Sequence, residues 1–454
     1  MEVLSQAPEP TIKCYHSVIG TQATKDLYQV FSPDSIYTSG KNLQSYNFER
    51  SLDNFGGSFS FTIKEDTENL IDPFMDKVQP LDIIEITEGS GFGATVDFIG
   101  IVTTISIGGM ASNLNKSVTI SGKSIEWLFS YLNINCDIKI AIFNTAEANN
   151  IFKTDFATLN GTIGIPIQQV VESSIKMFRG QVGEFKTISN YAISDLIDIW
   201  FKPGYVDASP DKFAYPISSN LFESGKCNII DFLKKLLPAP IYEIFGYMDA
   251  LGNPKIAFRT APFDNPVATY KINATHLTDY TLTRSCEEVY TAFMTYIEGT
   301  YLDPSFYMNL TAAQLDELKG YNFAKSNLSK SAIYGYQLLT CSFVGYNDTP
   351  DAKMDKSQIM QMNQKLEKWF SNLDEMYTGD FTLVNYLNNP LEKKAKIGEW
   401  LNFANDLYYV VSEKHSWTYG DNPMLNYQVI RGGNYMSGVF SPVKRLSAVY
   451  KEFD

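Results

Sequence analysis

His415 is the residue that most readily suggests chemistry, because Glu413 and Ser416 lie beside it in the run LYYVVSEKHSW. A serine, a histidine and an acid are the parts of a nucleophilic triad. Side chains alternate along a strand, however, so Tyr409, Glu413, His415 and Trp417 share one face and Ser416 points to the other. We therefore predict a structural histidine. A triad assembled from distant parts of the chain stays open, although the sequence has no GxSxG elbow.

Two pairs of acids, Glu85 with Glu88 and Asp374 with Glu375, are of the residue type that glycosidases use. Acidic residues are far more often part of a solvated surface, and this is our interpretation of both pairs. A glycan hydrolase stays open as an alternative function.

Metal and nucleotide chemistry are not indicated. His16, His276 and His415 have no partner histidine at metal-ligand spacing. The run SVTISGKS at 117–124 ends like a phosphate-binding loop, but serine stands where that loop needs its first glycine. The run GSGFGA, from Gly89, lacks a strand–helix setting. We predict no catalytic residue, no cofactor and no metal.

The composition predicts a strand-rich protein with partners. Of 454 residues, 44% are hydrophobic and 19% charged, and the chain holds 30 Phe, 28 Tyr and 5 Trp. Aromatic residues suit strands and subunit interfaces, although they also suit a carbohydrate-binding adhesin. The 37 basic and 51 acidic residues give a net charge of −14, which argues against strong nucleic-acid binding. A wall that DNA slides past without sticking is compatible with this charge.

The termini and cysteines indicate assembly in the cytoplasm. The five cysteines stand far apart in the sequence, which favours reduced thiols over disulfides or a zinc site. The opening run MEVLSQAPEP lacks the apolar core of a secretory signal. No apolar run approaches the length of about 18 residues that spans a membrane.

Strand patterns occupy residues 11–121. In GGSFSFTIKE, Phe59, Phe61 and Ile63 alternate with polar residues, and LDIIEIT, VDFIGIVTTISI and KSVTISG continue the pattern. Short strands with glycine turns between them suggest a compact barrel or sandwich.

The middle of the chain is more helical. Apolar residues recur at helical spacing within 125–132, 166–178 and 190–201. A further helix should end at Pro238 and Pro240, followed by a hairpin of IYEIFGYM and PKIAFRT around the turn ALGN. Residues 302–377 suggest a helical insertion, whose clearest stripe runs to Met376, with Gly379 as a left-handed stop.

Three motifs resemble baseplate hub proteins of contractile phage tails and related injection systems. The strands YYV, HSW and a last strand closing in Arg-Gly resemble the second tube-like domain of that family, and GGSFSFTI, DIIEI, FIGIVTTI and VTISGKS resemble its first. A helix and hairpin ending in R-x-x-P-F resemble its middle. The motif positions are Gly57, Phe59, Gly100, Gly122, Arg259, Pro262, Phe263, Tyr409, His415, Trp417, Arg431 and Gly432.

The resemblance implies a strand-dominated α+β protein that is not an enzyme. The expected parts are a first tube-like β-barrel domain (1–124), a mixed α/β middle domain (125–270), a second tube-like β-barrel domain (271–301 plus 378–436), a helical insertion (302–377) and a C-terminal tail (437–454). Because the sequence stops at Asp454, soon after the second barrel, any lytic or piercing function is expected on another polypeptide.

The resemblance also implies the partners. A homotrimer of two-barrel chains would form a pseudo-sixfold ring in the virion tail baseplate, joining the tail tube protein to the central spike protein. Other baseplate proteins would surround it, and the tape measure protein and DNA would pass through its channel. A tail-associated cell-wall hydrolase and a carbohydrate-binding adhesin are the alternatives.

Overall fold

The computed structural model describes residues 10–19, 22–31, 41–65, 78–89, 94–109, 116–134, 166–179, 191–209, 227–262, 266–298, 328–344, 356–384, 394–436 and 439–441. Strands predominate in these ranges, as the sequence predicts. None of the helices described is long and apolar enough to cross a membrane.

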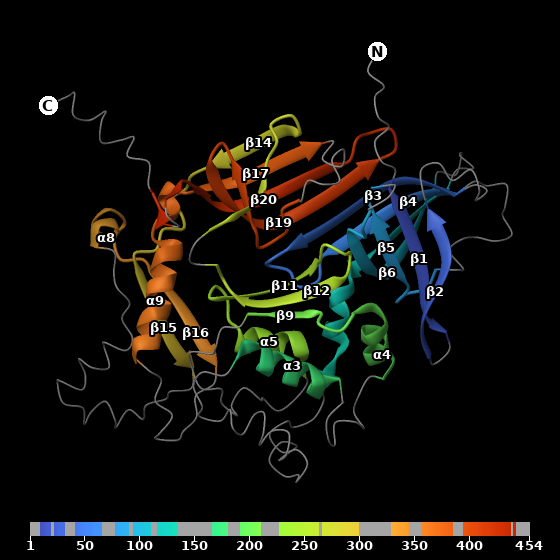
Figure 1. Cartoon of the computed structure of the whole chain (residues 1–454), viewed down its shortest axis with the longest axis horizontal. Helices are drawn as coiled ribbons and strands as arrows, with labels where there is room; N and C mark the ends of the chain where they lie inside the picture. The colour runs from blue at the N-terminus through green and yellow to red at the C-terminus, as the bar shows by residue number, and fades with distance from the viewer. Residues whose placement is uncertain are drawn as a thin grey trace, which may run out of the picture.

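One 13-stranded sheet extends across the molecule (Figure 1). Its N block consists of β1 (Thr11–Ile19), β2 (Gln22–Phe31), β3 (Lys41–Ser51), β4 (Ser58–Glu65), β5 (Ile83–Thr87), β6 (Phe98–Gly109) and β7 (Lys116–Ser124). Its C block consists of β13 (Ala268–Lys271), β14 (Leu277–Thr283), β17 (Tyr377–Val384), β18 (Trp400–Phe403), β19 (Asp406–Thr418) and β20 (Met424–Gly433). The blocks join where β19 pairs antiparallel with β3.

The two blocks repeat one strand order. The N block runs β3-β4-β7-β6-β5 and the C block β14-β17-β20-β19-β18, in the same sequence order and with antiparallel neighbours throughout. The correspondence ends at the next strand, because β1 pairs antiparallel with β5 while β13 pairs parallel with β18. This repeat is hidden in the sequence because it concerns pairing and not residue identity.

Alternation along the strands gives each block its own apolar core. In β4 the side chains of Phe59, Phe61 and Ile63 are buried, while those of Ser58 and Thr62 are half-exposed, as predicted. The N-block core also contains aromatic residues of β2, β3 and β6, and the C-block core those of β17, β19 and β20.

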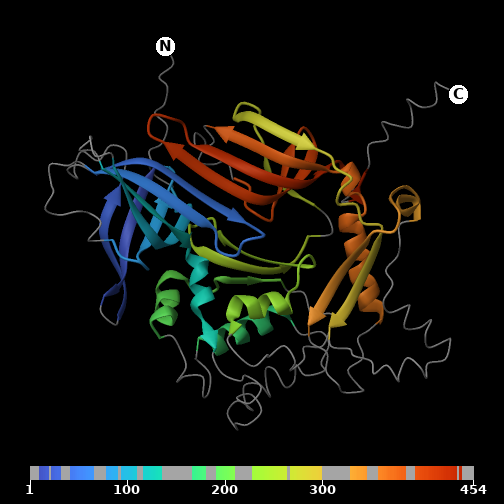
Figure 2. The ribbon, with the colours of Figure 1, turned by 180° about the vertical axis from the view of Figure 1, so that it is seen from behind.

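A smaller sheet of β11 (Tyr242–Met248), β12 (Pro254–Thr260) and β9 (Val206–Ala208) lies beneath the large one, with α3 (Ile167–Phe178) and α5 (Ile229–Leu236) on its far side (Figures 1 and 2). The hairpin and these helices are as predicted, as is α4 (Tyr191–Trp200). Residues 125–131 form the 3-10 helix η2 (Ile125–Tyr131), and β8 (Asn133–Ile134) pairs with β10 (Cys227–Asn228).

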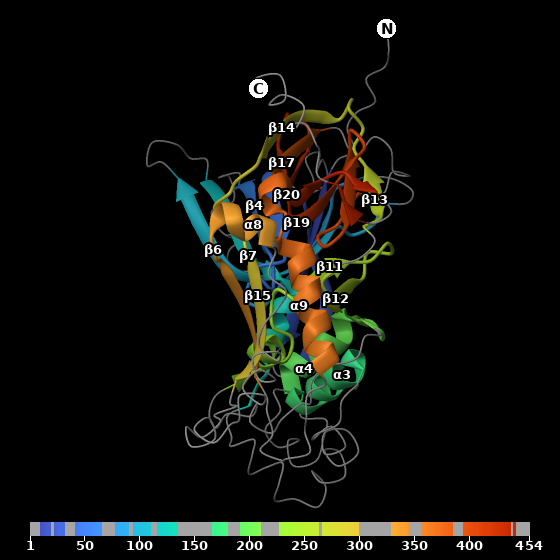
Figure 3. The same cartoon turned by 90° about the vertical axis from the view of Figure 1, so that its left-hand side faces the viewer.

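The region expected to be a helical insertion is mixed. Besides α8 (Leu328–Tyr334) and α9 (Lys356–Phe370) it contains β16 (Leu338–Val344), which pairs in parallel with β15 (Ala292–Glu298) outside the large sheet (Figure 3). Residues 292–298, expected in the second barrel, therefore pair with a strand of the insertion.

The predicted helix stop at Gly379 is wrong. The helix α9 ends at Phe370, the short η6 (Leu373–Glu375) follows, and Gly379 lies inside β17. A Cβ at Gly379 would stand 1.7 Å from the Thr281 carbonyl oxygen, so glycine is required by close strand pairing rather than by a left-handed turn. At the C-terminal end, β21 (Tyr435–Met436) pairs with β22 (Val439–Phe440).

Candidate functional site

His415 lies in the half of β19 that joins the C block to the N block. Residues 412–418 of β19 pair with residues 45–51 of β3, which places His415 opposite Phe48. His415 is buried and Ser416 is half-exposed, and their partners on β20 are Leu425 and Met424. The two side chains therefore point to opposite faces, as predicted.

The predicted face of Tyr409 is wrong because β19 contains a bulge. The register with β20 breaks between Val410 and Ser412, leaving Val411 as an extra residue. Val410 and His415, on either side of the break, face the same side as their β20 partners, and Tyr409 faces the other. One inserted residue thus reverses the alternation on which the prediction depended.

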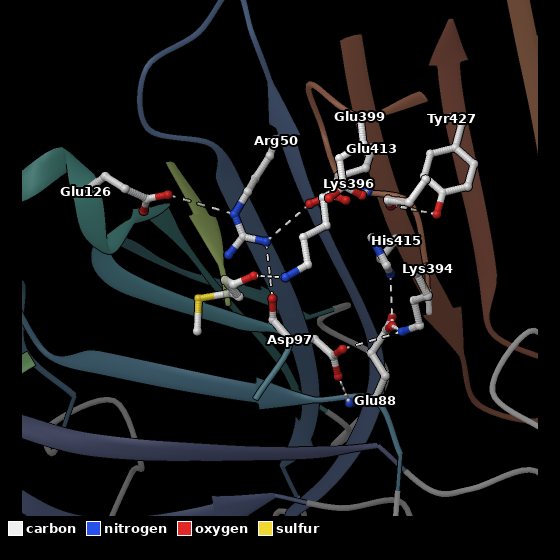
Figure 4. Close-up of polar contacts among 12 residues, drawn as sticks. Arg50, Glu88, Asp97, Glu126, Lys394, Lys396, Glu399, Glu413, His415 and Tyr427 are labelled. Atoms are coloured by element: carbon white, nitrogen blue, oxygen red, sulfur yellow. Dashed lines mark hydrogen bonds and ion pairs between the residues drawn. The ribbon is translucent and has the colours of Figure 1, made fainter. Parts of the chain in front are cut away.

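Seven charged or titratable side chains, called here the polar seam, lie where the blocks meet (Figure 4). They are Arg50, Glu88, Asp97, Glu126, Lys394, Glu413 and His415. Members come from both blocks and from η2, so the seam connects three parts of the chain.

Glu88 is the centre of one half of the seam and is 0% exposed. Its Oε2 lies 2.8 Å from Lys394 Nζ and 2.9 Å from His415 Nδ1, and Tyr46 donates its hydroxyl to Oε1 at 3.0 Å. Burial alone would raise the pKa of Glu88, but the nearby His415 and Lys394 lower it well below its usual value. The backbone N–H of Glu88 donates to Asp97 Oδ2 at 2.8 Å.

Arg50 is the centre of the other half. It lies 3.8 Å from Glu126 Oε1 and 3.4 Å from Glu413 Oε1, and donates to the Asp97 carbonyl oxygen at 3.1 Å. Its guanidinium also lies over the ring of Phe98 at 4.6 Å. Burial raises the pKa of Glu126 although Arg50 opposes this. Removing Arg50 would leave the carboxylates of Glu126 and Glu413 buried without their cation. The seam therefore holds the blocks in one arrangement.

A row of stacked rings follows the same junction. His415 stacks on Phe48 with ring centroids 4.3 Å apart, Phe48 on Tyr46 at 6.2 Å, and Tyr46 on Trp417 at 5.9 Å. His415 and Trp417 come from the C block and the other two rings from the N block. Two motif positions thus belong to one inter-block stack.

Two further motif positions, Gly100 and Gly122, form a slot around the ring of Phe59, and a third, Gly57, lies against β3. A Cβ at Gly100 would stand 2.5 Å from Phe59 Cδ1, and a Cβ at Gly122 would stand 2.7 Å from Phe59 Cε1 and 1.9 Å from the Ile101 carbonyl oxygen. Gly57 is in contact with Glu49 of β3, whose carbonyl oxygen would stand 2.1 Å from an added Cβ. These glycines allow strands and rings to approach closely.

Arg259 and Tyr409 meet on the opposite face of β19. Arg259 donates to Glu243 Oε2 at 3.0 Å and to the Tyr409 hydroxyl at 3.1 Å, and Tyr409 donates to Glu243 Oε1 at 2.6 Å. Arg259 also donates to the Gly398 carbonyl. The middle sheet is therefore tied to the C block. Pro262, just past β12, is half-buried.

Arg431 and Gly432 fix the end of β20. Arg431 Nε donates to the carbonyl of Trp369 at the end of α9, and its guanidinium lies 4.0 Å from the Trp369 ring. Burial lowers the pKa of Arg431 to about 10. Gly432 leaves room for the ring of Tyr408, which would stand 2.2 Å from an added Cβ. Phe263, the remaining motif position, lies outside the described residues.

The surface interpretation of Glu85 and Glu88 is wrong, because both are buried. Glu85 accepts from the Tyr15 hydroxyl at 2.7 Å, so the two acids serve different networks. Asp374 and Glu375 both pair with Lys330, at 2.5 and 2.7 Å. Asp374 and Glu375 are half-buried, and Glu85 also pairs with Lys25 at 3.1 Å, so all four acids have ion-pair partners.

The sequence did not single out Arg50, Asp97, Glu126 or Lys394. The sequence does contain an indication for Arg50. Tyr46, Phe48 and Arg50 are every second residue of β3 and share its buried face, so the pattern places a charge on an apolar face. For Lys394 no local pattern exists, because its partner Glu88 lies in the other block.

Replacing Tyr409 by phenylalanine is expected to lower the free energy of unfolding by about 1–2 kcal/mol. The change removes one hydrogen bond each to Glu243 and Arg259 but leaves the Arg259–Glu243 pair intact. Urea denaturation measures the loss. Tyr419→Phe, at an exposed tyrosine, is the matched control and should change stability little. Equal effects of the two substitutions would contradict the role of this contact.

No family model and no curated protein matches the chain. Among solved structures, the chain is similar to a 43 kDa tail protein of prophage MuSo2 from Shewanella oneidensis, with a TM-score of 0.48, 11% identity and coverage of 93% of this chain and 98% of that one. It is similar to a tail protein from Neisseria meningitidis MC58, with a TM-score of 0.46, 9% identity and coverage of 93% and 96%. It is also similar to prophage tail protein gp18 from Listeria monocytogenes EGD-e, with a TM-score of 0.45, 10% identity and coverage of 97% and 98%. All three are tail proteins, and two of them are from prophages.

Proposed function

We propose that this chain is the structural hub of a contractile tail baseplate, with no catalytic role. Three copies form a pseudo-sixfold ring that joins the tail tube to the central spike and leaves a channel. The observation that carries this proposal is the repeated strand order of the two blocks, joined edge to edge in one sheet. Two similar blocks in each chain allow three chains to present six similar units around an axis.

The polar seam supports a geometric role. A ring between a sixfold tube and a threefold spike needs the two blocks of each chain at a fixed angle. The seam provides this through buried ion pairs and stacked rings that cross the junction. Because these groups are paired with one another, moving one block past the other would separate buried charges, at high cost.

The net charge of −14 per chain suits a channel for DNA, since a negative wall repels phosphate. The proposed partners are the tail tube protein, the central spike protein and other baseplate proteins, with the tape measure protein and DNA passing through. The proposed location is the virion tail baseplate, after assembly in the host cytoplasm. The five-part division of the chain described above is part of the same proposal.

Native mass measurement with negative-stain imaging tests the proposal. We expect a species with the mass of three chains and annular particles, formed by the chain alone or together with its spike protein. A monodisperse monomer without annular particles, even in the presence of the spike, would contradict the ring. Release of soluble fragments from cell walls by the purified chain would favour the hydrolase instead.

A further inference from the structure

Several strand edges of the large sheet, those of β2 and β13 among them, have no partner strand within the described residues, and two further ones bear on assembly. One is the outer edge of β14, the last strand of the C block. The other is the outer half of β6, residues 103–109, because β5 pairs only with residues 98–101. Both edges expose apolar side chains, Tyr280 at 52% and Ile107 at 55%. Residues 103–109 carry no charge, so no charged side chain of this segment disfavours strand pairing.

The edge strand β14 corresponds residue by residue to β3. The pairing of β3 with β4 matches Leu43 to Ile63 and breaks between Leu43 and Ser45. The pairing of β14 with β17 matches Leu277 to Leu383 and breaks between Leu277 and Asp279. The same irregularity at the same place makes Leu277 the counterpart of Leu43.

Counting onward from this break, Tyr280 is the counterpart of Tyr46 and Leu282 that of Phe48. Each tyrosine lies opposite a phenylalanine of the next strand, since Tyr46 pairs with Phe61 and Tyr280 with Phe381. Arg284 then corresponds to Arg50.

The strand β6 corresponds in the same way to β19. The pairing of β6 with β7 breaks between Val102 and Thr104, and that of β19 with β20 breaks between Val410 and Ser412. Ile107 is then the counterpart of His415. The outer half of β19 is the part that β3 covers within the chain.

We propose that β14 of one copy pairs antiparallel with the outer half of β6 of the next copy, repeating between chains the contact that β3 makes with β19 within one chain. The counterparts fix the register. Ile107 lies opposite Leu282, as His415 lies opposite Phe48, and Ser106 lies opposite Thr283, as Lys414 lies opposite Glu49.

The partner that fits these edges is a second copy of this chain. The contact is head-to-tail, because two different surfaces meet, and such contacts form closed rings when the rotation closes. In the proposed ring, the rotation that carries the N block onto the C block of one chain also carries that C block onto the N block of the next chain. The inference rests on the proposed ring and adds the strands and the register through which it forms.

The seam between chains differs chemically from the seam within the chain. Where Glu413 faces Arg50 within the chain, Ile105 takes the place of the acid between chains. Ile107 and Leu282 likewise replace a stacked histidine and phenylalanine. In this register Arg284 lies opposite Ile105, so the contact between chains contains no pair of opposite charges and its assembly should depend little on ionic strength.

A disulfide between Ser106→Cys and Thr283→Cys, in a Cys286→Ser background that removes an exposed native thiol, tests the register. Residues directly opposite in an antiparallel pair have the Cα separation that a disulfide needs. We expect covalent species of two and three chains on non-reducing gels. The control joins Ser106→Cys with Thr281→Cys, two residues out of register on the same face, and single-cysteine variants give the background.

Cross-linking of the shifted pair as strong as that of the matched pair would overturn the register. A native mass of three chains in a sample that forms no disulfide between the matched cysteines would also overturn the register, but it would remain consistent with the proposed ring. A chain that remains monomeric and forms no covalent species would overturn both.

A second variant separates assembly from folding. Ile107→Lys places a charge in the proposed apolar contact, although this side chain is exposed in the single chain. We expect at least about a tenfold weakening of assembly, with a melting temperature of the isolated chain close to that of the wild type. Unchanged assembly would overturn the proposal.

Discussion

Replacing Glu88 by alanine is expected to lower the free energy of unfolding by about 3–5 kcal/mol, the range for breaking a buried ion pair from one side. Glu88 is fully buried, and its loss leaves the imidazole of His415 and the hydroxyl of Tyr46 without their carboxylate partner. Lys394 would lose its 2.8 Å partner and keep the longer contact to Asp97, at 3.4 Å. Urea denaturation at pH 7 measures the change. The control is Glu287→Ala, at an exposed acid, which should cost no more than about 0.5 kcal/mol.

The same variant makes a prediction about pH. The folded state lowers the pKa of Glu88, so its carboxylate contributes stability above the ordinary glutamate pKa of about 4.3, and this is lost as the pH falls through the lower folded pKa. The difference between wild type and Glu88→Ala should therefore be constant near neutral pH and narrow below about pH 4. Glu126, whose pKa is raised, contributes a pH dependence of stability with the opposite sign. Glu126 is present in both proteins, so its contribution cancels in the difference between them. A stability difference between the two proteins that grows as the pH falls would contradict the lowered pKa of Glu88.

The local elements could be predicted because their patterns are local. The alternation of Phe59, Phe61 and Ile63 is enough to define β4, and the stripe of α5 with the prolines after it defines that helix and its end. The stripe ending at Met376 misled because apolar residues at steps of three or four also occur where a helix gives way to a strand. Strand pairing with β14, which lies far away in the sequence, decides the conformation of Gly379.

The seam could be predicted only in part, because its partners are distant in sequence. The resemblance supplied His415, Trp417, Phe59 and the glycines as separate positions. Their contacts depend on the pairing of β3 with β19 and of β4 with β7. The bulge at Val411 has no signature of residue type, and it alone reversed the predicted face of Tyr409. A sequence pattern fixes which face is apolar but not where an extra residue shifts it.

The second large loss of stability is expected when the glycines beside the ring of Phe59 are replaced. Gly122→Ala is expected to destabilise the protein by about 3 kcal/mol or more, because the new methyl group would meet the Ile101 carbonyl at 1.9 Å and the main chain must move. Gly100→Ala should cost about 2 kcal/mol, since the three atoms nearest to its new methyl group belong to the rings of Phe59 and Phe98, which can shift more easily than main chain.

Combining each alanine with Phe59→Leu separates the two causes. Leucine vacates space beside residue 100, so the Gly100→Ala, Phe59→Leu pair should be less destabilised than the sum of its single substitutions by about 1 kcal/mol. The Gly122→Ala, Phe59→Leu pair should show little such recovery, because the obstacle at residue 122 is a backbone oxygen on the neighbouring strand. Urea denaturation of the three single and two double variants completes both cycles. Equal recovery at the two positions would mean that the ring, and not the approach of β6 to β7, is what requires glycine at 122.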